Sequence, residues 1–514
     1  MKWFFRCWLL VLPIAGHAQA PVWLWATGFT GSSGVQMRDI ASASNNGCFA
    51  LGSFGPDLYL PFDTLVSAGG AGTYFVAHVD TLGAVTWAAQ FSDRAASMHG
   101  LPNDGLSCLI PFVGSTMVNG QAVTATTSGH AALVVELDNT GSITSMISIA
   151  LTQWPAVTTP TRIVHHTEGS GIVLADTFAD SVSVGGTWLY GGGLYLARFT
   201  GQGALLWAEH IGCGSPVEGS VHIDAEGRTL IGIPIGCDPD PDDPFFGIGP
   251  IVSYGPTGSY QWHRPYVLNE FGPPPVMSRR PNGNALVSAS FLPQGGGSVT
   301  TTMELDEVGA EIWTNQLSGP TTYDRPISIH AIGNGSTLLS GDVLSTYDFG
   351  PWTIPSSFGP DGFVASIDGS GNWQWATAET SGEIFTNHAA PGTNSRIYTS
   401  GFTGTGASLG SHWITTNMGS FTGFVACLGD VTLNTPDTGS PFETLLVWPN
   451  PTTSTLHLSQ RFGQGQMLRI INPSGRTIES RPLDPSATTI DISDLGAGIY
   501  LLRIGEHQAR IVKQ

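Results

Sequence analysis

A repeated turn motif constrains the fold of this chain more than any other sequence feature. In each copy an apolar run leads into a turn of the form Asp-x-x-Gly, and Trp follows four residues after Gly. An Asp side chain can accept hydrogen bonds from the backbone a few residues further on, and Gly can adopt positive φ. The motif therefore predicts β-hairpins with short, bulged turns. The complete copies are Asp80, Gly83 and Trp87; Asp306, Gly309 and Trp313; and Asp368, Gly371 and Trp375.

Degenerate copies extend the array. Thr200 and Gly255 stand where Asp is expected, and the copy at Asp138 has lost its Trp. A second pair of predicted strands lies between successive hairpins, as in residues 39–53 and 325–341, so one unit is predicted to contain four strands. The tryptophans recur every 51 to 62 residues, with one double interval of 120, which predicts about seven units.

The two ends of the array complement each other. Residues 424–429 carry only the first half of the hairpin motif, whereas residues 22–26 carry only the second half. Pairing these halves would leave no open sheet edge at the seam. The predicted fold is all-β: a seven-bladed β-propeller over residues 19–430, followed by a small Ig-like antiparallel β-sandwich. The array resembles the seven-bladed β-propeller (SBBP-like) repeats of secreted bacterial proteins over roughly residues 22–430.

The first 18 residues have the layout of a signal peptide. Lys2 and Arg6 precede a short apolar run, and the small residues that follow predict cleavage between Ala18 and Gln19. No later stretch is long and apolar enough to be a transmembrane span. The formal net charge of −20 argues against a nucleic-acid or anionic-membrane partner, because binding phosphates requires clustered cations.

Five cysteines remain after removal of the predicted signal peptide, so they cannot all pair within one chain. Cys213 and Cys237 flank one apparent hairpin, and this is the preferred bridge. Other pairings, and no pairing, stay open.

The C-terminal segment is predicted to be a separate module. Residues 431–444 read as a linker, and residues 445–514 contain short alternating strands broken by Pro-Asn-Pro and Gly turns. The segment resembles the type A C-terminal sorting domain of the type IX secretion system. The matching residues are Pro449, Asn450, Pro451, Gly475, Gly498, Ile499, Tyr500 and Lys513.

That resemblance implies partners and a destination. It implies passage through the type IX secretion machinery across the outer membrane, removal of the module, and then release or attachment to surface lipopolysaccharide. An ordinary terminal Ig-like domain is the alternative interpretation.

No catalytic, cofactor-binding or metal-binding residue is predicted. The acidic run in residues 237–244 could offer oxygen ligands to calcium, but its alternating prolines favour a solvated loop. His165 and His166 are adjacent, so on a strand they would point to opposite faces. The repeat tryptophans could stack on sugars, although their constant position favours packing between strands.

Three functions fit these features. The leading hypothesis is a non-enzymatic binding, adhesion or scaffold module that is secreted or displayed on the cell surface and takes a glycan or protein ligand. The second is a propeller hydrolase or lyase acting on polysaccharide, which would require two carboxylates about 5 to 10 Å apart beside a perturbed pKa. The third is a structural component of a surface layer.

Overall fold

The chain forms two compact units, Met1–Asp430 and Val431–Gln514, each described here by itself. The computed structural model describes residues 20–44, 47–67, 73–95, 97–125, 130–154, 171–212, 220–224, 226–232, 250–265, 275–291, 296–319, 325–354, 360–379, 383–416, 420–429, 443–445, 447–458, 461–463, 466–472, 477–505 and 507–514.

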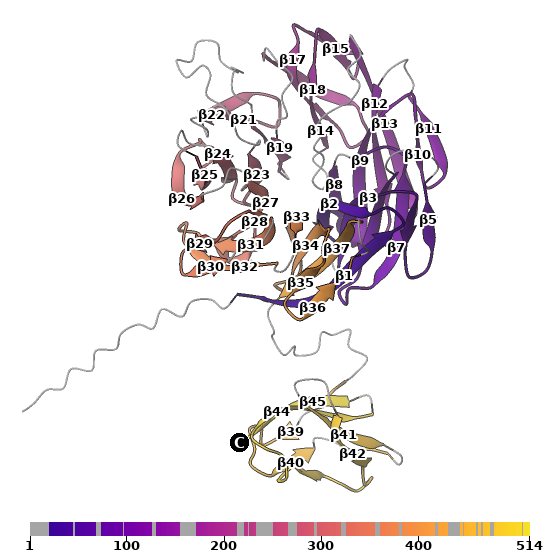
Figure 1. Ribbon diagram of the computed structural model, residues 1–514, viewed down its shortest axis with the longest axis vertical. Coiled ribbons are helices and arrows are strands. Elements are labelled where there is room, and N and C mark those ends of the chain that lie inside the picture. Colours follow the sequence, from indigo (N-terminus) through magenta and orange to yellow (C-terminus); the bar gives the residue numbers. More distant parts are fainter. Residues whose placement is uncertain are drawn as a thin grey trace, which may run out of the picture. The chain divides into compact units, whose positions relative to one another are not determined.

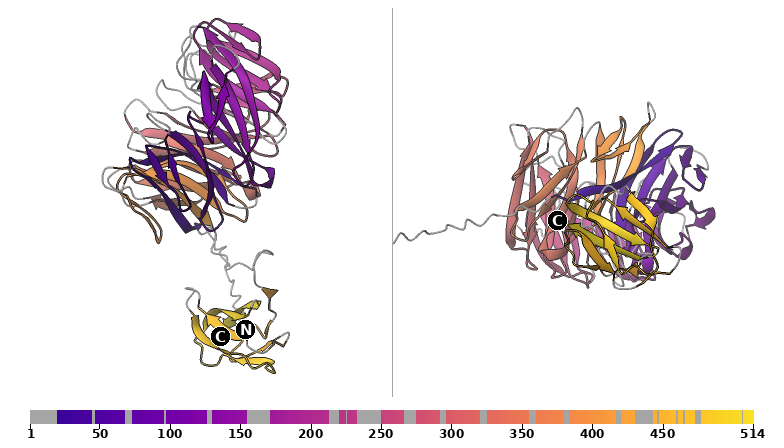
Figure 2. Two further views of the ribbon diagram at one scale, coloured as in Figure 1. Left: turned by 90° about the vertical axis from the view of Figure 1, so that its right-hand side faces the viewer. Right: turned by 90° about the horizontal axis from the view of Figure 1, so that it is seen from below.

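Regular structure in the described residues is almost entirely β. Strands account for it apart from two 3₁₀ turns, Pro102–Asp104 and Gly333–Gly335 (Figure 1, Figure 2). None of the described helices is long and apolar enough to span a membrane. The all-β prediction is confirmed.

The first complete sheet of the N-terminal unit shows the pattern that later sheets repeat. Its strands β2 (Val35–Ser42), β3 (Cys48–Phe54), β6 (Thr73–Val79) and β7 (Val85–Phe91) pair in chain order, and every pair is antiparallel. The β6–β7 connection is the turn that begins at Asp80, with a register shift between His78 and Val79. The bulged hairpin predicted from the motif is therefore present.

Six further sheets follow in chain order, one of them with three described strands (Figure 1). Their strands are β8 (Ser97–Leu101), β9 (Gly105–Val113), β12 (His130–Leu137) and β13 (Ile143–Trp154); β14 (Ile172–Phe178), β17 (Gly193–Phe199) and β18 (Leu205–Gly212); β19 (Ser220–Ile223), β20 (Thr229–Gly232), β21 (Pro250–Tyr254) and β22 (Tyr260–Pro265); β23 (Val276–Arg279), β24 (Ala285–Phe291), β25 (Ser298–Leu305) and β26 (Glu311–Gly319); β27 (Arg325–Ala331), β28 (Thr337–Val343), β31 (Asp361–Ile367) and β32 (Trp373–Ala378); and β33 (Ile384–Pro391), β34 (Ile397–Thr403), β37 (Thr422–Gly429) and β1 (Val22–Gly31).

The prediction of four strands per repeat did not include a set of additional short hairpins, which we call the outer hairpins. They turn at two-residue or slightly longer loops such as Asn119-Gly120 and Gly185-Gly186, which supply the positive φ that tight hairpins need. These hairpins are β4 (Asp57–Tyr59) with β5 (Thr64–Val66), β10 (Ser115–Val118) with β11 (Gln121–Thr124), β15 (Ser181–Val184) with β16 (Thr187–Tyr190), β29 (Tyr347–Phe349) with β30 (Trp352–Ile354), and β35 (Ala407–Leu409) with β36 (His412–Ile414).

The two ends of the array pair as predicted. β1 runs antiparallel to β37, with partners from Val22 and Gly429 to Phe29 and Gly423. The first strand of the described chain thus completes the sheet made by β33, β34 and β37. This pairing removes the exposed edge that β37 would otherwise present.

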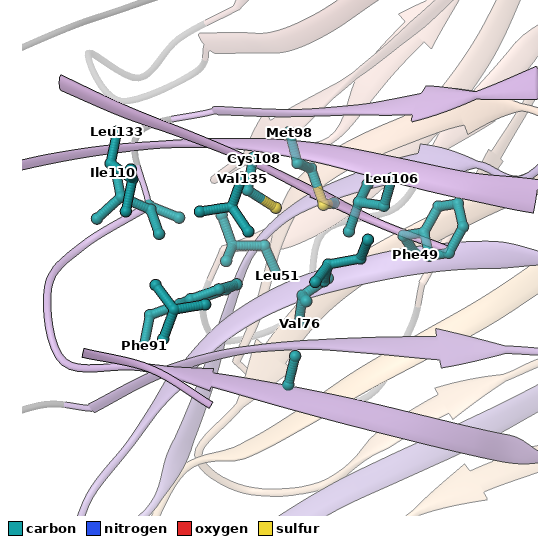
Figure 3. Close-up of a cluster of buried hydrophobic side chains, with 14 of the residues drawn as sticks. Phe49, Leu51, Val76, Phe91, Met98, Leu106, Cys108, Ile110, Leu133 and Val135 are labelled. Atoms are coloured by element: carbon teal, nitrogen blue, oxygen red, sulfur yellow. The ribbon is translucent and has the colours of Figure 1, made fainter. Parts of the chain in front are cut away.

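Successive sheets share hydrophobic cores. Figure 3 shows one of them, in which Phe49 and Leu51 of the first sheet meet Leu106 and Val135 of the next. Burying one such side chain contributes about 1.5 to 3 kcal/mol. Equivalent clusters join each later sheet to its successor, and the last one joins β34 and β37 back to β2 and β3.

The C-terminal unit contains two sheets around one core. One sheet has the order β38 (Glu443–Thr444), β45 (His507–Lys513), β44 (Gly498–Ile504), β41 (Met467–Ile471) and β42 (Thr477–Pro482); the other has β39 (Val447–Trp448), β40 (Thr455–Leu458) and β43 (Thr489–Asp491). Leu456, Ile470 and Leu502 lie fully buried between them. β38 pairs parallel to β45, so the sandwich is not wholly antiparallel, and β38 covers the last two residues of the predicted linker.

Candidate functional site

The repeated turn is built by the Asp side chain and the Gly backbone. Asp80 Oδ1 accepts hydrogen bonds from the backbone N–H groups of Leu82 (2.8 Å) and Ala84 (2.9 Å), and Gly83 has φ +87°. The turns at Asp306 and Asp368 repeat both bonds at 2.8 to 3.0 Å, with Gly309 at φ +81° and Gly371 at φ +85°. The side chain therefore satisfies backbone donors that a tight turn would otherwise leave unpaired.

The degenerate turn at Thr200 keeps the same geometry with a different acceptor atom. Thr200 Oγ1 accepts the backbone N–H of Gln202 at 3.3 Å and of Ala204 at 3.1 Å. A hydroxyl thus replaces the carboxylate, which explains how the sequence can depart from Asp without losing the hairpin.

The repeat tryptophans join one sheet of the N-terminal unit to the next sheet. Trp25 Nε1 donates to the carbonyl of Thr81 at 3.0 Å, and Trp87 Nε1 donates to Asn139 at 2.9 Å. Trp207 and Trp262 make the equivalent bonds to Pro256 and Glu307, at 3.0 and 2.8 Å. In each case the acceptor lies directly after the first residue of the next turn.

The turn glycines make room for these indoles. A Cβ added at Gly83 would lie 2.9 Å from the Trp25 ring, and one added at Gly141 would lie 2.7 Å from the Trp87 ring. Trp313 packs on Gly371 in the same way, but its Nε1 donates to Glu304 at 2.8 Å. Trp87, Trp313 and Trp375 are 8%, 6% and 8% exposed, so these rings are occupied by packing and are closed to a ligand.

Polar side chains gather on six strands, here called the inner strands, each of which is the first strand of its sheet. β8, β2, β33, β27, β23 and β19 pack side by side in that order. His99, His222 and His330 occupy one register position on three of them: they pair with Ser107, Leu230 and Leu338. Each of these partners also pairs, on its other side, with the second-to-last residue of the strand that leads into a repeated turn.

These imidazoles influence each other electrostatically. Burial among neighbouring strands, together with Arg279, His330 and His99 and against the opposing effect of Asp224, lowers the pKa of His222 to about 3. Burial and then His388 lower the pKa of His330 to about 4. Both imidazoles are therefore neutral at pH 7.

One carboxylate joins this group. Asp39 Oδ1 lies 3.4 Å from His388 Nδ1, on the neighbouring strands β2 and β33. Burial raises the pKa of Asp39, and His388 and the backbone N–H of Ile40 partly offset that rise. Asp39 is the one carboxylate on the six strands β8, β2, β33, β27, β23 and β19, so a second carboxylate for glycoside cleavage is not among their residues.

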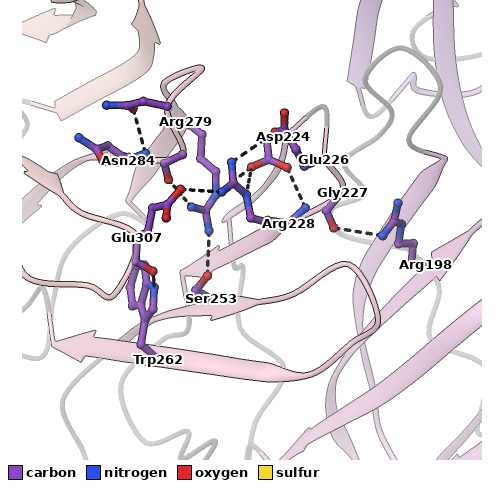
Figure 4. Close-up of polar contacts among 12 residues, drawn as sticks. Arg198, Asp224, Glu226, Gly227, Arg228, Ser253, Trp262, Arg279, Asn284 and Glu307 are labelled. Atoms are coloured by element: carbon purple, nitrogen blue, oxygen red, sulfur yellow. Dashed lines mark hydrogen bonds and ion pairs between the residues drawn. The ribbon is translucent and has the colours of Figure 1, made fainter.

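A cluster of arginines and carboxylates links turns of two adjacent sheets, β19–β22 and β23–β26 (Figure 4). Arg228 contacts Asp224 at 2.7 Å and Glu307 at 3.1 Å, and Arg279 lies 3.6 Å from Asp224. Arg279 also donates to the Gly283 carbonyl at 2.6 Å, and burial lowers its pKa to about 10, so it stays charged at neutral pH. These groups neutralise each other and hold adjacent turns together, which is a structural role.

The sorting-domain motif residues meet although they are far apart in sequence. Asn450 Oδ1 accepts the Val512 backbone N–H at 2.8 Å, and Thr452, directly after Pro451, forms a bridge with Lys513. Gly498, Ile499 and Tyr500 pair with Lys513, Val512 and Ile511. The X-Pro peptides at Pro449 and Pro451 are cis, and the bonds from Asn450 and Thr452 hold the terminal strand on the edge opposite β44.

Several predicted residues lie outside the described residues. They are Ala18 and Gln19 at the predicted cleavage site, Cys213 and Cys237 of the preferred bridge, Gly475, the acidic run 237–244, and the pair His165 and His166. Cys48, Cys108 and Cys427 are described, buried and free, and burial raises the pKa of each thiol. No group of three metal-ligating side chains occurs in the described ranges.

Sequence reasoning missed the inner-strand histidines and the arginine cluster. A signal for the histidines exists, because His99, His222 and His330 each stand eight residues before the residue with which they pair on the next strand. The arginine cluster has no such signal, since its members come from unrelated positions in several turns.

Comparison with known proteins gives one family match. Residues 446–514 match the family model described as a secretion system C-terminal sorting domain. No curated protein sequence matches the chain.

Solved structures give weak likenesses. A protein of unknown function from Dyadobacter fermentans is 9% identical, with 80% of this chain and 98% of that chain covered and a TM-score of 0.36. A member of the DUF4221 family from Bacteroides vulgatus is 8% identical, with 79% and 98% covered and a TM-score of 0.30. Neither likeness bears on the function of this chain.

The family match and the geometry of the C-terminal unit agree on one point. The motif residues that the structure describes lie on the turn and strands that close the sandwich, within the matched range. Residues 446–514 form a secretion system C-terminal sorting domain of the type IX kind, and the chain is an exported protein, secreted or carried on the outer-membrane surface.

Proposed function

We propose that residues 19–430 form a seven-bladed β-propeller that acts outside the cell as a binding, adhesion or scaffold module. The type IX machinery would deliver it by its C-terminal domain, after which it is released or attached to surface lipopolysaccharide. Its ligand would be a glycan or a protein. The observation that carries this proposal is the pairing of β1 with β37, which joins the first described strand to the last sheet of the array.

Two further observations support the proposal. Core clusters link each sheet to its successor and link the last sheet to the first, as expected for blades around an axis. Indole hydrogen bonds from Trp25, Trp87, Trp207 and Trp262 cross four of these sheet boundaries in one direction. Such a scaffold is rigid, and rigidity lowers the entropic cost of binding.

Binding assays on the purified mature chain test this proposal. We expect retention on at least one class of extracellular ligand, scored on immobilised polysaccharides, proteins and whole bacterial cells. Release of reducing or unsaturated sugar ends from a polysaccharide would instead support the hydrolase or lyase. Self-association into sheets without ligand binding would support a structural component of a surface layer.

The enzymatic alternative has one specific observation in its favour. Asp39 combines a raised pKa with an imidazole 3.4 Å away, which is an acid–base pair. If the chain cleaves polysaccharide through this pair, Asp39→Asn should abolish cleavage while leaving ligand retention intact. Cleavage by Asp39→Asn at the wild-type rate would reject this pair as the catalytic group.

A further inference from the structure

Trp188 and Tyr190 form an exposed aromatic pair on an outer hairpin. They stand two residues apart on β16, so both side chains project from the same face of the strand. Trp188 is 47% exposed and Tyr190 is 67% exposed. Their ring centroids are 6.2 Å apart, and their planes lie within 20° of parallel.

The two faces of this hairpin have different partners. Val182 and Val184 of β15 are fully buried in a core cluster, and Leu189 of β16 packs against the same cluster. The opposite face carries the two aromatic rings, which pair across the strands with Ser183 and Ser181. The hairpin is thus anchored by its apolar face, and small hydroxyl residues stand beside the rings.

The exposure of these two rings contrasts with the burial of the repeat tryptophans in the N-terminal unit. Trp87 is 8% exposed, and its Nε1 donates to a backbone carbonyl of the next turn. Burying Trp188 and Tyr190 would be favourable, because large aromatic surfaces gain the most from leaving water. Exposing two of them together on an exported protein therefore indicates a contact surface.

The local charge favours an uncharged ligand. β15 and β16 contain no charged residue, and the ionisable residue directly before β15 is the exposed Asp180. The chain as a whole carries a formal charge of −20. An acidic polysaccharide or a phosphorylated lipid would be repelled here, whereas the C–H faces of neutral sugars stack on aromatic rings and their hydroxyls can bond serine.

We propose that Trp188 and Tyr190 form a stacking site for a chain of neutral sugar residues. This inference rests on the proposed binding function and names the ligand class and the residues. Two near-parallel rings side by side on one strand would engage successive sugar residues of one glycan, with Ser183 within reach of their hydroxyls.

Affinity electrophoresis of the full mature chain tests the site. The probes are the neutral polysaccharides mannan, laminarin and hydroxyethylcellulose, with alginate as an acidic comparison. We expect retardation by at least one neutral polysaccharide and none by alginate. Trp188→Ala should weaken that binding at least tenfold, and Trp188→Ala combined with Tyr190→Ala should abolish it.

Trp413→Ala is the matched control. Trp413 is 59% exposed on the outer hairpin β35–β36 and pairs with Ser408, just as Trp188 pairs with Ser183. No stacked ring accompanies it in the described part of the chain. We expect Trp413→Ala to bind within about twofold of wild type, and all three variants to keep the wild-type unfolding midpoint because the rings are exposed.

The outcomes separate this site from the proposed function. If the double variant bound glycan as the wild type does, the proposed site would be wrong, but the proposed glycan-binding function would stand. Binding to proteins or cells without any neutral polysaccharide would overturn the ligand class alone. A preference for alginate would overturn the charge argument, and no binding of any kind would overturn both proposals.

Discussion

The repeated turns and the outer hairpins use similar residues in opposite ways. At the turns, Trp87 is buried and donates a hydrogen bond to the next sheet, and Gly141 leaves space for its ring. On the outer hairpins, Trp188 is exposed, and Gly120 has nothing within 4 Å of the position of a Cβ. The same residue types therefore hold the scaffold in one region and are free for contact in the other.

Truncating a tryptophan in each region should give the largest contrast. Trp87→Ala should lower the free energy of unfolding by about 3 to 5 kcal/mol, because it leaves a cavity and an unpaired carbonyl at Asn139. Trp188→Ala should change it by less than about 0.5 kcal/mol. Urea denaturation followed by circular dichroism measures both. Equal losses would break the comparison.

Adding a methyl group at a glycine should give the next largest contrast. Gly83 and Gly120 both have positive φ, +87° and +78°, but only Gly83 faces an indole. Gly120→Ala should cost about 1 kcal/mol for backbone strain alone. Gly83→Ala should cost roughly twice that, because the ring of Trp25 must move. If both cost the same in urea denaturation, the close approach adds nothing.

Removing a turn carboxylate should have a smaller effect. Asp306→Ala loses the hydrogen bonds to Val308 and Ala310 and should cost about 1 to 2 kcal/mol. Asp306→Thr should recover part of that loss, since Thr200 makes the same bonds in a sister turn. Thermal unfolding of the two variants tests the order, and an equal loss for Thr and Ala would contradict it.

The inner strands predict a dependence of the free energy of unfolding on pH. The folded-state pKa values of His222, about 3, and His330, about 4, lie below the ordinary value of 6.5. The unfolded chain therefore binds more protons between these values, so stability should fall as the pH drops from 7 through 5.

Urea midpoints measured at pH 7, 6 and 5 check this sign. His222→Gln combined with His330→Gln should flatten the dependence. A wild-type midpoint that rises on acidification would show that the two imidazoles are not held neutral by the fold.

Cleavage between the two units should have the smallest effect. Proteolysis within residues 431–444 should release an N-terminal fragment that keeps the β-type circular dichroism and unfolding midpoint of the intact chain, because the cores of the two units share no residue. Loss of structure in the N-terminal fragment would place the boundary elsewhere.

Much of the fold could be predicted because its signals are local. The turns at Asp80, Asp306 and Asp368 depend on residues within four positions, and the strands around them alternate every second residue. The outer hairpins were not predicted, although Asn119-Gly120 is a typical hairpin turn. Four strands had already been assigned to each repeat. The exposure of Trp188 was also missed, since a tryptophan in a strand is equally compatible with a core and with a surface.

The sequence by itself determined the hairpins, their bulged turns, the complementary ends of the array and the sorting domain, all of which follow from short-range turn chemistry and motif order. Only the tertiary structure decided that Trp25 bonds to Thr81, that His99, His222 and His330 share a register, and that Trp313 turns to Glu304 instead of the next turn. These pairings join residues of different units or strands, and a side chain's partner across such a distance depends on how sheets pack and which neighbouring groups compete for the bond.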